Sequence, residues 1–118
     1  AAQSRRPRDG LGARDCEFIV WGSAGAMDPG NKPVYLPGHF TGSQPRGSNR
    51  QHITQKPVDM MRELVRIVPA DGTVLDPFTG AGTTGVAALM EGRHFIGIEH
   101  SAKYANIARA RLTEAIAA

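Results

Sequence analysis

A glycine-rich segment and two carboxylates in the second half of the sequence have the spacing of a nucleotide-binding site. Residues 80–85, GAGTTG, satisfy the pattern G-x-G-x-x-G. Glycines in such a turn let the backbone approach a ligand closely. Glu99 lies 23 positions after Asp76, where a carboxylate at the end of the next strand accepts hydrogen bonds from both ribose hydroxyls. The pattern predicts a turn that binds a nucleotide-like cofactor.

The charge of Asp76 bears on which cofactor the turn can hold. Asp76 stands immediately before Pro77, at the mouth of the turn. A carboxylate there would repel a pyrophosphate by about 1 kcal/mol or more, and it would attract a cation. S-adenosylmethionine carries an ammonium and a sulfonium but no phosphate, so the charge favours it over NAD. A nicotinamide-dependent dehydrogenase stays open because the glycine pattern also fits NAD, whereas a P-loop is excluded because its spacing and lysine are absent.

Alternating helix and strand signals surround this turn. Apolar residues repeat at intervals of three and four between Pro57, which suits a first helical position, and Pro69, which ends the helix. The expected elements are a helix over 57–68, a strand over 73–75, a helix over 83–91, a strand over 94–98 and a last helix capped by Ser101. That last helix would place Tyr104, Ile107, Ala108, Leu112 and Ala115 on one side. Such alternation is typical of an α/β fold with a parallel sheet and flanking helices.

The first half of the chain has weaker signals. Residues 1–13 form a basic arm with little to bury, which we expect to be irregular. The apolar run at 16–21 predicts a strand, and only an edge strand could form at 34–36 because prolines bracket it. Residues 22–50 form a long loop rich in Gly and Pro, which is uncommon in a compact domain unless it is functional or partly disordered.

Composition and length restrict the class of protein. The 118 residues have a net charge of +3, with 41% hydrophobic and 21% charged residues and one Cys. This length suits one domain and excludes a two-domain enzyme, and the composition argues against general disorder. A single cysteine cannot form an internal disulfide, which fits a reducing compartment such as the cytoplasm. No apolar stretch approaches the roughly 20 residues of a membrane span, so no membrane partner is expected.

Several segments together resemble one protein family. Residues 73–85, TVLDPFTGAGTTG, resemble the S-adenosylmethionine-binding motif of DNA amino-methyltransferases, and HITQKP at 52–57 resembles the segment just upstream in the β-class of that family. The resemblance covers about residues 14–113. It implies that residues 14–118 are the S-adenosylmethionine-binding part of a partial Rossmann-like methyltransferase fold. The other segments that match are GRHFIGIEHSAKYANIARARL at 92–112, CEFIVWGSAG at 16–25 and VYLPG at 34–38.

The resemblance implies cofactor roles for particular residues. Asp76 would meet the methionine ammonium, Lys56 the methionine carboxylate and Glu99 the ribose hydroxyls, while His100 would lie near the adenine. No metal is expected, because no cluster of His, Cys or acidic residues has metal-ligand spacing. The full set of expected cofactor-binding residues is His52, Thr54, Gln55, Lys56, Asp76, Pro77, Phe78, Thr79, Gly80, Gly82, Thr83, Thr84, Glu99 and His100.

The family's catalytic motif, [DNS]-P-P-[YFW], does not occur in this sequence. The segment at 27–31, MDPGN, lacks the second proline and the aromatic residue, and Asp76 is assigned to the cofactor. No catalytic residue is therefore assigned. We expect the chain to be a C-terminal, cofactor-binding portion that lacks a central strand and is inactive alone. We also expect its sheet to expose an apolar edge and to self-associate. The alternative is a non-catalytic remnant or accessory module that binds S-adenosylmethionine or DNA.

Double-stranded DNA is the partner that the resemblance implies, in bacterial or phage restriction-modification. Arg46 and Arg50 in the long loop could contact phosphates, as could the arginines between Arg5 and Arg14 in and just after the arm. Adenine N6 is favoured over cytosine N4 as the target only because it is more frequent in the family. Methylation of cytosine carbon 5 is disfavoured, because Cys16 lacks the Pro-Cys context of the required nucleophile.

Overall fold

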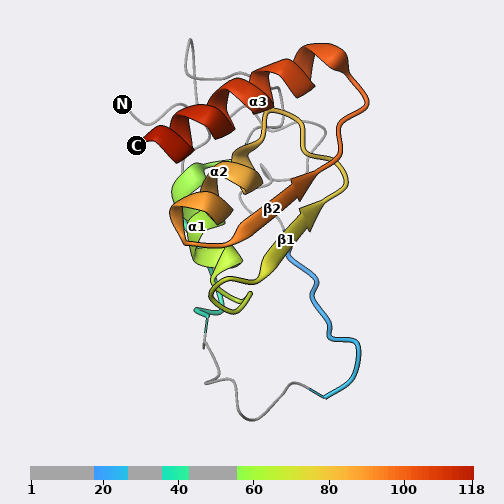
Figure 1. Ribbon diagram of the computed structural model, residues 1–118. Helices are drawn as coiled ribbons and strands as arrows, with labels where there is room; N and C mark the ends of the chain where they lie inside the picture. The colour runs from blue at the N-terminus through green and yellow to red at the C-terminus, as the bar shows by residue number, and fades with distance from the viewer. Residues whose placement is uncertain (1–17, 27–35, 43–55) are drawn as a thin grey trace, which may run out of the picture.

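The computed structural model describes residues 18–26, 36–42 and 56–118. Its helices and strands all lie in the last of these segments (Figure 1). Within the described residues no helix is long and apolar enough to cross a membrane. In chain order the elements are α1 (Val58–Val65), β1 (Thr73–Asp76), α2 (Thr83–Met90), β2 (His94–Gly97) and α3 (Ala102–Ala117).

The two strands form a parallel pair, as the alternation of elements predicts. Thr73 lies opposite His94 and Asp76 lies opposite Gly97, so the strands end together at one edge of the sheet. Helix α2 makes the crossover between them and contacts both strands, α1 and α3. Figure 1 shows α2, the element that follows the glycine-rich segment, lying between α1 and α3.

Small side chains allow α2 to approach its neighbours closely. The buried apolar residues of the described chain include Ala87 and Ala88 of this helix. A Cβ on Gly85 would lie 2.5 Å from the ring of Phe95 and 2.7 Å from Leu112, which is closer than real Cβ contacts. Glycine is therefore required where α2 packs between β2 and α3.

Helix α1 begins almost as predicted and ends earlier. Pro57 has an extended ψ of 132° and is the N-cap residue, just outside the helix. From the sequence we expect it to be the first residue inside the helix. The helix stops at Val65 instead of Val68, and Pro69 has no N–H with which to continue the helical hydrogen bonds to the Val65 carbonyl. The amides of Ile67 and Val68 donate to carbonyls three residues earlier, which tightens the end of the helix into turns.

Arginine side chains hold the chain together near the residues where β1 and β2 begin. Arg62 of α1 pairs with Glu91 just beyond α2, at 2.7 Å. Arg93 donates from Nε and Nη2 to the carbonyl of Val68, at 3.0 and 2.8 Å. These contacts hold the segment between α1 and β1 against the segment between α2 and β2.

Helix α3 follows the predicted pattern. The Ser101 side chain accepts a hydrogen bond from the Tyr104 amide at 3.5 Å and caps the helix, as expected. Ala108 is buried. Tyr104, Ile107, Leu112 and Ala115, the other members of the predicted apolar side, are half-buried.

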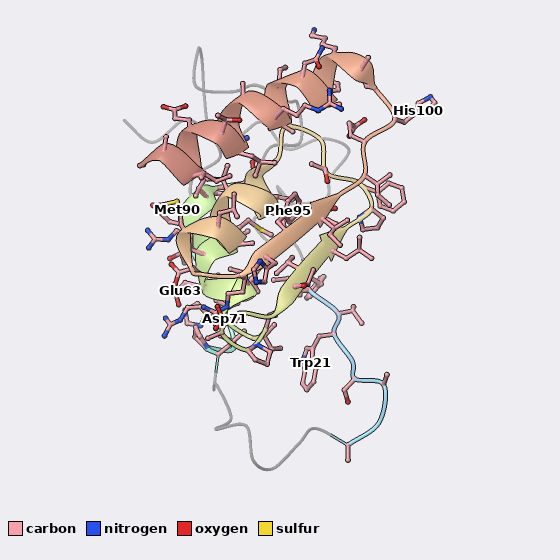
Figure 2. All side chains as sticks on the ribbon, viewed as in Figure 1. Trp21, Glu63, Asp71, Met90, Phe95 and His100 are labelled. Carbon is pink, nitrogen blue, oxygen red and sulfur yellow. The ribbon has the colours of Figure 1, made fainter. Side chains whose placement is uncertain are left out.

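The strand predicted at 16–21 is wrong for the residues that the structure describes. Residues 18–21 are irregular, and Phe18 and Trp21 are 91% and 72% exposed. Figure 2 shows Trp21 standing clear of the helices and strands. β-Branched and aromatic residues favour a strand only where a neighbouring strand and a packing surface are available. The arm at 1–13 lies outside the described residues, as does most of the possible strand at 34–36, and the loop at 22–50 is described only in part.

The two faces of the sheet differ in exposure. Val74 and Phe95 lie opposite each other and are half-buried, with Phe95 directed to α2. Leu75 and Ile96 also lie opposite each other, on the other face, and they are 60% and 55% exposed. Ile98, two residues beyond Ile96, is likewise exposed. The second face is therefore an apolar surface that the described chain leaves open.

Candidate cofactor site

The glycine-rich segment forms a tight turn between β1 and α2. The Thr79 amide donates to Ile98 at 3.0 Å, which ties the start of the turn to the end of β2, and the Gly82 amide donates back to Thr79 at 3.0 Å. Gly80 and Gly82 have φ angles of 57° and 83°, a left-handed conformation that glycine adopts without a steric penalty. A Cβ on Gly82 would also lie 3.0 Å from that of Ala108. Gly82 therefore meets both a backbone requirement and a packing requirement.

Glu99 links this turn to the start of α3. Its Oε2 accepts a hydrogen bond from the Gly80 amide at 2.8 Å, and its Oε1 accepts one from the Ser101 amide at 2.8 Å. These bonds fix both carboxylate oxygens at the edge of the sheet where β1 and β2 end. A carboxylate offers about four acceptor positions, which is more than these two amides use.

Asp76 lies at the same edge, at the end of β1. Its Oδ1 accepts a hydrogen bond from the Phe78 amide at 3.0 Å, the local turn that aspartate commonly forms. Its carbonyl accepts from the Thr79 hydroxyl and from the Ile98 amide, both at 2.9 Å. Asp76 is therefore held by backbone on each side, which fixes a negative charge beside the turn.

Phe78 and Thr79 have opposite environments. The Phe78 side chain is 88% exposed, whereas Thr79 is buried. A Cβ on Gly97 would collide with the Thr79 hydroxyl oxygen and approach the Phe95 ring, so Gly97 provides the space that Thr79 occupies. The turn thus has a packed base and an exposed aromatic ring near its mouth.

Arg111 is a contact of the turn that the sequence reasoning missed. From α3 its Nη1 donates to the carbonyl of Ala81 at 2.7 Å and to the hydroxyl of Thr83 at 3.1 Å. Burial lowers the pKa of the Arg111 guanidinium, and nearby Glu114 opposes this shift. Helical spacing places Arg111 on the same side of α3 as Ala108, but it does not indicate that this side meets the glycine turn.

The structure places the expected site residues in different surroundings. Asp76, Gly80, Gly82 and Glu99 come together at the ends of the strands. Half-buried Lys56 precedes α1, and exposed His100 lies between β2 and α3, where Figure 2 shows it directed away from the ribbon. Pro77 is exposed, Thr83 is buried and Thr84 is half-buried. His52, Thr54, Gln55, Arg46 and Arg50 lie outside the described residues.

The metal-binding side chains of the described segments do not cluster. Within residues 18–26, 36–42 and 56–118, no group of three or more His, Cys, Asp or Glu side chains is arranged to hold a metal ion.

A parallel strand pair, a glycine turn between strand and helix, and an acidic residue at the next strand end define a Rossmann-like nucleotide-binding unit. Comparison with known proteins identifies the family within this class. A family model described as DNA methylase matches residues 19–110. The chain therefore belongs to the DNA methylase family. This membership removes the nicotinamide-dependent dehydrogenase alternative.

Two curated proteins with similar sequences support this family assignment. YubD of Escherichia coli (strain K12) is 35% identical over 99 residues, which is 83% of this chain and 41% of YubD. Type II methyltransferase M2.DpnII of Streptococcus pneumoniae is 46% identical over 63 residues, 52% of this chain and 24% of that protein. The chain spans less than half the length of these curated relatives.

A solved structure supports the fold. The complex of M1.HpyAVI with SAM is 41% identical, with a TM-score of 0.53, and the match covers 58% of this chain and 35% of that chain. The fold is a partial Rossmann-like methyltransferase fold, as the sequence predicts.

Proposed function

We propose that this chain is the S-adenosylmethionine-binding portion of a site-specific DNA amino-methyltransferase. The observation that carries the proposal is the Glu99 carboxylate, which Gly80 and Ser101 hold beside the glycine turn at the edge of the parallel sheet. The relation to a methyltransferase solved with SAM supports the choice of cofactor. The name of M2.DpnII, a type II methyltransferase, supports DNA modification as the setting.

The described residues fit the charges of this cofactor. Asp76 would attract the methionine ammonium, and the left-handed backbone at Gly80 and Gly82 leaves room for close approach. Glu99 would accept the ribose hydroxyls, and Lys56 would offer positive charge to the methionine carboxylate. The remaining proposed contacts are His52, Thr54, Gln55, Pro77, Phe78, Thr79, Thr83, Thr84 and His100.

Methyl transfer is the chemistry that S-adenosylmethionine would supply. The exocyclic amino nitrogen of a base forms a bond to the methyl carbon as the carbon–sulfur bond breaks, leaving S-adenosylhomocysteine, and the amino group loses one proton. The enzyme increases the rate by holding the two reactants in line.

We propose adenine N6 in preference to cytosine N4 as the target, with double-stranded DNA as the substrate. We propose Arg46 and Arg50 as phosphate contacts.

The exposed apolar residues of the sheet support the proposal that a catalytic segment is missing from this chain. Leu75, Ile96 and Ile98 expose apolar surface at a sheet of only two described strands. Sheets of two strands are rarely stable by themselves in water. A catalytic segment that carries the Pro-Pro-aromatic motif would supply the missing central strand at the edge of this sheet, and the chain without that segment would self-associate through that edge.

Alone, the chain should transfer no methyl group to DNA. Without the Pro-Pro-aromatic motif it has no group to orient the target amino nitrogen. Incubating the chain with tritiated S-adenosylmethionine and double-stranded DNA measures this directly, with a complete DNA amino-methyltransferase as the positive control. Steady incorporation of label into DNA by the pure chain would refute the assignment as a cofactor-binding portion.

Replacing Asp76 with asparagine tests the proposed ammonium contact. The amide oxygen can still accept the Phe78 amide hydrogen bond, so the turn should keep its fold while losing the negative charge. We expect Asp76→Asn to weaken S-adenosylhomocysteine binding by about tenfold, or about 1.4 kcal/mol, with little change in melting temperature. Isothermal titration calorimetry measures the affinity, and Asp59→Asn on the exposed side of α1 is the matched control. Equal affinities for wild type and Asp76→Asn would exclude the contact.

A further inference from the structure

The glycine turn is held from two sides by groups on neighbouring elements. On one side Glu99 accepts the Gly80 amide at 2.8 Å. On the other side Arg111 reaches back 30 residues along the chain to donate to the Ala81 carbonyl at 2.7 Å. The cofactor roles expected from the sequence include Glu99 but not Arg111.

Arg111 acts on one particular peptide group. The carbonyl of Ala81 and the amide of Gly82 belong to the same planar unit, so fixing both ends prevents its rotation. Arg111 fixes the carbonyl, and the Thr79 carbonyl accepts the Gly82 amide hydrogen at 3.0 Å. This unit leads into the left-handed Gly82 that caps α2.

The same guanidinium nitrogen also restrains the first turn of α2. It donates to the hydroxyl of Thr83 at 3.1 Å, and Thr83 is buried. A positive charge beside the N-terminus of a helix is unfavourable, because that end already carries partial positive charge. Arg111 therefore stands where helix electrostatics alone would disfavour it, held by hydrogen bonds to the turn.

We propose that Arg111 is a positioning residue that holds the Ala81–Gly82 peptide in the orientation required for cofactor binding. This inference rests on the proposed function of the turn, because the purpose of the orientation is to present the backbone to S-adenosylmethionine. Arg111 itself touches Ala81 and Thr83 and acts through the turn.

Three variants separate this role from a general contribution to folding. Arg111→Met keeps an unbranched apolar stem but removes the guanidinium group and its donors. Arg111→Lys restores a cationic donor on a flexible stem. Arg109→Met is the matched control, since Arg109 is exposed and its guanidinium donates to Asn106 within α3, at 3.2 Å.

Amide hydrogen exchange measured by NMR reads the turn without any cofactor. We expect the Gly82 amide to exchange at least ten times faster in Arg111→Met than in wild type, with an intermediate rate in Arg111→Lys. The Ile98 amide, which bonds to Asp76 in the sheet, should keep its wild-type rate. An unchanged Gly82 rate in Arg111→Met, or an equal rise at Gly82 and Ile98, would overturn the positioning role.

Cofactor affinity then tests the purpose of that positioning. By calorimetry, Arg111→Met should bind S-adenosylhomocysteine about tenfold more weakly than wild type and Arg109→Met, and Arg111→Lys should recover part of the loss. Wild-type affinity in a variant with faster Gly82 exchange would overturn the link to binding. If wild type itself binds no S-adenosylhomocysteine, the proposed function fails, and the exchange rates still decide whether Arg111 holds the turn.

Discussion

Replacing Glu99 with glutamine is expected to weaken S-adenosylhomocysteine binding by roughly 100-fold, or about 2.7 kcal/mol. The carboxylate accepts from Gly80 and from Ser101, one amide on each oxygen. An amide side chain has only one oxygen, so its NH₂ group must face one of these two donors. The variant would also lose the charge that strengthens hydrogen bonds from the ribose hydroxyls, each worth about 1.5–3 kcal/mol.

Isothermal titration calorimetry with S-adenosylhomocysteine measures this loss. Glu63→Gln is the matched control, because Glu63 is exposed on α1 and forms a surface pair with Arg66, at 3.4 Å. Such a surface pair contributes little, so the control should bind as wild type does. The ribose role of Glu99 would be wrong if Glu99→Gln and Glu63→Gln bound equally well.

Replacing Gly97 with alanine should destabilise the fold by about 2–4 kcal/mol, comparable to severe overpacking of a core. The new Cβ would collide with the hydroxyl oxygen of Thr79 and lie 2.8 Å from the Phe95 ring. Thr79 cannot move away freely, because its hydroxyl donates to Asp76 and its amide donates to Ile98. The collision would therefore either separate the strands or displace the glycine turn.

Thermal unfolding followed by circular dichroism measures this effect, and for a chain of this size we expect the melting temperature to fall by roughly 8–16 °C. Gly38→Ala is the control, since a Cβ there meets nothing within 4 Å and Gly38 is exposed. Wild-type stability in Gly97→Ala would mean that Thr79 does not pack against β2 as the structure shows.

The elements around the turn could be predicted because their signals are local. Ser101 has its capping partner three residues away, and α1 ends close to Pro69. The positions of Asp76 and Glu99 at adjacent strand ends followed from the parallel arrangement, which in turn followed from the alternation of elements. Each of these inferences needed only a short segment of sequence.

Features that depend on distant contacts could not be predicted. The apolar run that includes Phe18 and Trp21 has strand composition, yet the described structure offers it no partner. Composition alone cannot supply a neighbouring strand. Arg111 was missed because an arginine on a helix usually faces solvent, and its partner lies 30 residues away. Both outcomes are set by packing between elements.

The most direct test of the account is an NMR titration of the ¹⁵N-labelled chain with S-adenosylhomocysteine, with NAD titrated in parallel. We predict that S-adenosylhomocysteine shifts the amide signals of Gly80, Gly82 and Ser101, the groups that border the Glu99 carboxylate. We predict that NAD leaves them unchanged, because Asp76 repels its pyrophosphate. Shifts produced by NAD and not by S-adenosylhomocysteine would contradict the assignment of this turn to S-adenosylmethionine.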